Sequence, residues 1–98
     1  MLEGKYLLKM ETPIGEIKGN LQLYWQRNEL CGILEVMGNK NYLSGGKAEE
    51  NKCAFTGDLN TPVGKITYQV LGILNGEKLD IYVETNKGRF KIDGTRVK

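Results

Sequence analysis

The stretch Thr12-Pro13-Ile14-Gly15-Glu16-Ile17 decides the fold of this 98-residue chain, because a close copy, Thr61-Pro62-Val63-Gly64-Lys65-Ile66, follows 49 residues later. Proline has a fixed φ that suits the second position of a type I turn, and glycine is favoured at the fourth position. Each stretch therefore predicts a β-hairpin. A shift of 49 residues also aligns the rest of the chain without a gap, pairing for example Leu30 with Leu79.

This ungapped shift indicates two copies of one four-stranded unit, residues 1–49 and 50–98, within a single domain that covers residues 1–98. In each copy apolar residues alternate with polar ones, as they do on a strand with one buried face. Turn-forming residues separate these runs. The further turns are predicted at Arg27-Asn28, Gly38-Asn39-Lys40, Glu49-Glu50-Asn51, Asn75-Gly76 and Asn86-Lys87-Gly88.

Eight antiparallel strands with one apolar face cannot stay flat without exposing their edges and half of their core. The sequence therefore predicts an all-β fold, an eight-stranded antiparallel up-and-down meander barrel formed by internal duplication. A two-layer β-sandwich is the alternative, since the same alternation fits both. Glycines at inward positions would supply the bends that closure needs. These are Gly19, Gly32, Gly45, Gly57, Gly72 and Gly94.

Charge and composition argue against several classes of partner. The formal charge of +2 comes from 14 basic and 12 acidic residues that are mixed along the chain, so no block of like charge marks a nucleic-acid site. The start, residues 1–5, is unlike a signal peptide, and no apolar run approaches membrane-spanning length. We expect a cytoplasmic protein with no nucleic-acid or membrane partner. Cys31 on the outer face and Cys53 on the inner face are expected to stay free thiols.

The residue types needed for common catalytic chemistry are missing. The chain has no histidine, which removes the commonest general base and metal ligand. Two cysteines on opposite faces cannot assemble a zinc site, and no phosphate-binding glycine loop precedes a helix. We therefore expect no enzyme activity, no catalytic residue, no metal site and no cofactor.

Gly4-Lys5-Tyr6 on the first predicted strand, together with Arg96 near the end of the last, resembles the calycin barrels, the lipocalin-like group. That resemblance implies that the aromatic ring begins the barrel and that the late arginine packs across it, a cation–π contact that closes one mouth. The paired Thr-Pro-x-Gly hairpins also resemble small uncharacterised bacterial domains built as a repeated meander. The latter resemblance implies no particular chemistry.

An eight-stranded barrel is wide enough either to be filled by its own side chains or to hold one small molecule. The sequence leaves both alternatives open. Tyr68 is the notable inward polar residue, because a buried hydroxyl needs a ligand, a water or a backbone partner. If the barrel is hollow, we expect a small apolar or amphipathic ligand in contact with Tyr6, Leu21, Leu34, Tyr68, Val70, Ile81, Phe90 and Arg96.

Apolar residues also recur on the face that should meet water, which suggests an alternative function. A cluster of exposed apolar side chains is typical of an interaction surface. The alternative is therefore a structural or protein-interaction domain that forms a homo-oligomer through Leu7, Tyr24, Ile33, Leu71, Ile73 and Tyr82.

The two copies differ at inward positions, so they fill the interior unequally. A specific site is expected where they differ. The differing pairs are Gly19 with Tyr68, Leu23 with Gly72, Gly32 with Ile81 and Asn41 with Phe90.

Overall fold

The computed structural model describes residues 2–13, 15–36, 38–61 and 64–97, with side chains for all of these except residues 59–61. It consists of eight β-strands, and none of the described residues lies in a helix that could cross a membrane. The strands are β1 (Gly4–Thr12), β2 (Gly15–Gln26), β3 (Glu29–Val36), β4 (Asn39–Glu49), β5 (Lys52–Thr61), β6 (Gly64–Asn75), β7 (Lys78–Thr85) and β8 (Gly88–Arg96).

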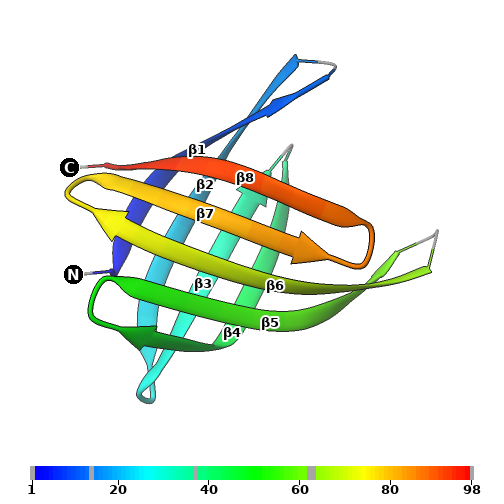
Figure 1. The fold of residues 1–98 in the computed structure, drawn as a ribbon. Helices are drawn as coiled ribbons and strands as arrows, with labels where there is room; N and C mark the ends of the chain where they lie inside the picture. The colour runs from blue at the N-terminus through cyan, green and yellow to red at the C-terminus, as the bar shows by residue number, and fades with distance from the viewer. Residues whose placement is uncertain (1, 14, 37, 62–63, 98) are drawn as a thin grey trace.

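All eight strands pair with their sequence neighbours, and β8 also pairs with β1, so the sheet is a closed antiparallel barrel. This confirms the predicted up-and-down barrel and excludes the sandwich, which would leave open edges. The strands β5 to β8 run across β1 to β4, so the two halves of the barrel form two crossed layers (Figure 1). Inward side chains from both layers meet between them.

The hairpins form largely where the turn residues predict them. Thr12 pairs with Gly15, and its hydroxyl donates a 2.6 Å hydrogen bond to the Gly15 carbonyl. In the second copy Thr61 pairs with Gly64, whereas Pro62 and Val63 of the predicted turn, like Ile14 in the first copy, lie outside the described residues.

Two further turns contain residues with positive φ, the left-handed conformation that asparagine and glycine adopt readily. Arg27 and Asn28 both have positive φ (53° and 65°), as a type I′ turn requires. The turn predicted at Asn75-Gly76 is displaced by one residue, because Asn75 is paired with Lys78 in the ladder and Gly76 takes the left-handed conformation with φ 62°.

A β-bulge in β4 corrects one predicted inward residue. The register shifts between Leu30 and Gly32, whose partners on β4 are Gly46 and Leu43. β4 therefore carries one extra residue at this point. Gly45 absorbs the extra residue with φ 66°, and the space where its Cβ would lie is open. Gly46, and not Gly45, is the glycine that faces the interior.

Tyr6 closes one end of the barrel. Its side chain is 1% exposed, and its hydroxyl donates a 2.6 Å hydrogen bond to the Leu2 carbonyl. The Arg96 guanidinium lies 5.4 Å from the centre of the Tyr6 ring and donates a 2.6 Å hydrogen bond to the Glu3 carbonyl. The contact between an early aromatic residue and a late arginine is thus present, and it joins β1 to β8.

The barrel closes along two short ladders. β4 pairs with β5 only from Lys47–Ala54 to Glu49–Lys52, and β1 pairs with β8 from Tyr6–Arg96 to Lys9–Asp93. The other neighbouring strands pair over nearly their whole length. Beyond each short ladder the two strands diverge, as β4 and β5 do in Figure 1.

Candidate functional site

The barrel encloses an apolar cavity of about 420 Å³. This volume falls within the range of small-molecule sites. Every strand contributes to its wall. The lining residues are Leu8, Leu21, Leu23, Leu34, Lys40, Asn41, Tyr42, Leu43, Cys53, Phe55, Ile66, Tyr68, Val70, Gly72, Leu79, Ile81, Val83, Thr85 and Ile92.

The structure brings together five of the eight ligand-contact residues expected from the sequence. Leu21 and Leu34 line the cavity from one layer of the barrel. Tyr68, Val70 and Ile81 line it from the other layer. A contiguous apolar wall thus exists where the alternation pattern placed it.

Tyr6, Arg96 and Phe90 do not line the cavity. Tyr6 on β1 is paired with Arg96, the last residue of β8, at the closed end of the barrel. The Tyr6 hydroxyl already donates a hydrogen bond to a backbone carbonyl. Phe90 is 47% exposed. Phe90 precedes Asp93 on β8, in the part of the strand that does not pair with β1. Its ring is therefore exposed to solvent although its parity is inward.

Two of the pairs that differ between the halves, Leu23 with Gly72 and Asn41 with Phe90, contribute residues to the cavity wall. Leu23 and Gly72, 49 residues apart, both line the cavity, and a Cβ on Gly72 would lie 2.8 Å from the Cys53 sulfur, so Cys53 packs over this glycine. Asn41 lines the cavity, whereas Phe90, its equivalent in the second half, does not line it and is 47% exposed. Three residues of these two pairs, Leu23, Asn41 and Gly72, are thus part of the wall.

Two inward glycines, Gly46 and Gly57, are covered by aromatic rings and leave no space. A Cβ on Gly46 would collide with the Phe55 ring, and one on Gly57 would collide with the Tyr68 hydroxyl and ring. An aromatic side chain packed over a glycine on the adjacent strand is a known way to stabilise a curved sheet. Phe55 and Tyr68 are held across these glycines, and their remaining surface lines the cavity.

The cavity reaches the surface where β4 and β5 diverge. Lys40 and Tyr42 on β4 line it although both are exposed, Tyr42 to 70%. Residues 39–46 of β4 have a paired strand on the β3 side alone within the described part of the chain. Backbone groups of a strand alternate between its two sides, so this edge carries unpaired N–H and C=O groups beside the opening.

Polar groups gather at this opening. The Asn41 amide and the Tyr68 hydroxyl form no hydrogen bond to any described residue, and Lys40 forms no ion pair with one. Thr85, in contrast, is occupied, because its hydroxyl donates to the Gly88 carbonyl and accepts from the Lys87 amide, both at 3.0 Å. Three side chains at the rim are thus available to a ligand.

Cys53 is a cysteine that lines the cavity. It is a free thiol with little exposed surface, and burial raises the pKa of this thiol, opposed by a backbone hydrogen bond involving Gly72. Cys31 is also free and buried. The Cys53 thiol is therefore protonated at neutral pH and behaves as a small apolar group.

Sequence reasoning missed the contribution of β4. Asn41 was visible as a polar residue aligned with Phe90, and this mismatch was the available signal. Lys40 and Tyr42 have outward parity and gave no signal, because they reach the cavity only where β5 moves away from β4. No group of three or more acidic or cysteine residues that could hold a metal ion occurs among the described residues.

The six residues proposed from the sequence for an interface do not form one surface. Leu71 and Tyr82 are opposite each other on β6 and β7, and they are 42% and 47% exposed. Tyr24 and Ile33 are partly buried on β2 and β3, in the other layer of the barrel (Figure 1). Ile73 is partly buried two residues from Leu71, and Leu7, exposed, lies on β1 between Asn20 and Thr95.

Comparison with known proteins identifies the fold and no family. No protein-family model matches the sequence, and no curated protein matches it. Among solved structures, a designed fluorescence-activating β-barrel is similar, with a TM-score of 0.57 and 10% sequence identity. The match covers 98% of this chain and 93% of the designed chain. The similarity extends over the whole barrel.

Proposed function

We propose that this protein is a non-enzymatic binding barrel that holds one small apolar or amphipathic molecule in its cavity. The cavity itself carries the proposal: about 420 Å³ of space with an apolar wall and a few polar groups at one opening. This combination is typical of small-molecule sites. The similar designed barrel, described as fluorescence-activating, supports the idea that this fold accommodates a small molecule.

The proposal includes two finer points. The Tyr6–Arg96 contact at the end of the barrel away from the opening supports a lipocalin-like arrangement, in which one end is closed and the other admits the ligand. The two free cysteines, Cys31 and Cys53, fit a protein that works in the reducing cytoplasm.

Native mass spectrometry and a matched pair of variants test the binding proposal. We expect the freshly purified protein to retain a small molecule or to bind the neutral dye N-phenyl-1-naphthylamine with enhanced fluorescence. Ile66→Trp should abolish dye binding because Ile66 lines the cavity near its opening. Ile17→Trp is the control, since Ile17 is the equivalent residue of the first hairpin and does not line the cavity. Equal dye binding by both folded variants would contradict the proposal.

Self-association is a second candidate, favoured by the exposed Leu71–Tyr82 pair. A second copy covering this face of β6 and β7 would bury both side chains. Leu71→Glu should then convert an oligomer to a monomer in light scattering. Leu7→Glu is the control, because Leu7 is more exposed and lies on β1, away from this pair. A wild-type protein that is monomeric at high concentration would rule this candidate out.

A further inference from the structure

The charged residues among the described lining of the cavity are of one sign. Among the described residues that line it, Lys40 is charged and none is an aspartate or a glutamate. The nearby acids lie outside the cavity wall: Asp58 on β5 is paired with Lys65 at 3.4 Å, and Glu35, opposite Lys40 on β3, does not line the cavity. The charge that lines the cavity, among the described residues, is therefore the positive charge of Lys40.

The polar groups also lie at one end of the cavity. Asn41 and Tyr68 can donate hydrogen bonds and have no partner among the described residues. Deeper in the cavity the wall is formed by aliphatic side chains and the protonated Cys53 thiol, for example Leu23, Leu79 and Ile81. A charged group placed at that depth would lose its hydration without a compensating partner.

We propose that the ligand is a single-chain amphiphile with an anionic head group, held at the β4–β5 opening by Lys40, Asn41 and Tyr68. The apolar tail lies along the aliphatic wall. An anionic oxygen accepts hydrogen bonds from the Asn41 amide and the Tyr68 hydroxyl and pairs with the Lys40 ammonium, and such charge-assisted bonds are the stronger ones. This inference rests on the binding function proposed above and adds the chemical class of the ligand.

Three compounds with the same ten-carbon chain test the head group. Decanoate and decyltrimethylammonium, each below its micelle concentration, and decanol, below its solubility limit, compete with N-phenyl-1-naphthylamine at pH 8 and low salt. We expect decanoate and decanol to displace the dye and decyltrimethylammonium to be the weakest competitor. Added salt should weaken decanoate and leave decanol unchanged, because salt screens an exposed charge pair.

A matched pair of lysine variants localises the effect. Lys40→Gln should weaken decanoate by about three- to tenfold and leave decanol unchanged, since only the charged head loses a partner. Lys47→Gln on the same strand should change neither by more than about twofold, because Lys47 is exposed outside the cavity. Lys40→Glu should reverse the order and favour decyltrimethylammonium over decanoate.

The outcomes separate the two proposals. If decanol and the dye bind but decanoate is insensitive to Lys40, or if the cation binds best to the wild-type protein, the head-group inference is wrong and the binding function stands. If neither the dye nor any of the three compounds binds, the binding function itself is wrong.

Discussion

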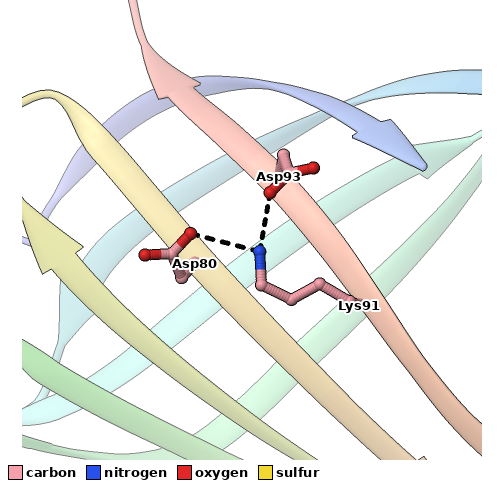
Figure 2. Close-up of polar contacts among 3 residues, drawn as sticks. All are labelled: Asp80, Lys91 and Asp93. Carbon is pink, nitrogen blue, oxygen red and sulfur yellow. Dashed lines mark hydrogen bonds and ion pairs between the residues drawn. The ribbon is translucent and has the colours of Figure 1, made fainter. Parts of the chain in front are cut away.

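Asp80 on β7 and Asp93 on β8 are directly opposite each other in the ladder, and the ammonium group of Lys91 lies between their carboxylates. Its Nζ is 3.1 Å from Asp80 Oδ1 and 2.6 Å from Asp93 Oδ1 (Figure 2). Like charges directly opposite on adjacent strands repel, and the shared ammonium offsets this repulsion. Lys91 also lies 5.4 Å from the centre of the Tyr82 ring.

Lys91→Met is therefore expected to destabilise the barrel at pH 7 by about 1 kcal/mol, measured by urea unfolding. Hydrogen bonding to Lys91 lowers the pKa of Asp93, and hydrogen bonding to Asp93 raises the pKa of Lys91. The lowered carboxyl pKa contributes stability above its unfolded value of about 4, and the raised lysine pKa contributes it below about 10. The effect of the variant should thus be full between about pH 5 and pH 10 and should disappear as Asp93 is protonated in acid.

Arg89→Met is the control for this prediction. Arg89 forms a single pair with Glu84 at 3.1 Å, but its side chain is far more exposed than that of Lys91. We expect a change of less than about 0.5 kcal/mol with little dependence on pH. A Lys91→Met variant as stable as Arg89→Met at pH 7 would show that the two aspartates need no counter-charge.

The alternation of apolar residues predicted the strands, the hairpins and the closed barrel. It assigns each residue to a face, and the face is correct for Leu21, Leu34 and Val70 because their strands are paired on both sides. It contains no information on where two strands stop pairing. Phe90 is therefore exposed although it was expected at the ligand, and Tyr42 reaches the cavity although its parity is outward, since both lie where one neighbouring strand has diverged.

The bulge in β4 was unpredictable for a related reason. Shifting the sequence by 49 residues aligns Gly45 with Gly94, and Gly94 does face inward. The bulge adds one residue to β4 without a gap in the alignment. As a result Gly46, and not Gly45, is the inward residue opposite Leu30. Sequence spacing alone cannot distinguish a bulge from a regular strand when both candidate residues are glycines.

The Tyr6 hydroxyl should contribute to stability although it is away from the cavity. Tyr6→Phe removes the donor to the Leu2 carbonyl and leaves that buried acceptor unpaired, which should cost about 1–2 kcal/mol in urea unfolding. Tyr82→Phe is the control, because Tyr82 is exposed on the outer face. Dye binding should be unchanged in both variants, and a loss of binding in Tyr6→Phe alone would place Tyr6 in the site.

Cys53 should report occupancy of the cavity. In a Cys31→Ser variant, iodoacetamide should modify Cys53 slowly at pH 8, because burial raises the pKa of the thiol and limits access. Decanol at saturating concentration should slow the reaction at least about fivefold, as measured by intact mass. In a Cys53→Ser variant the reaction of Cys31 should not respond to decanol. An equal response of both thiols would indicate a general change in stability.

Gly72 and Cys53 should be coupled through the space that they share. A Cβ on Gly72 would lie 2.8 Å from the Cys53 sulfur, so Gly72→Ala forces the thiol to move and should destabilise the barrel by about 1–3 kcal/mol. Cys53→Ala removes the sulfur, and in that background Gly72→Ala should cost less than about 0.5 kcal/mol, because the new methyl group enters the vacated space. Urea unfolding of the four proteins measures this coupling. If the two changes in unfolding free energy are additive, the Gly72→Ala methyl group does not displace the Cys53 thiol, and the coupling is absent.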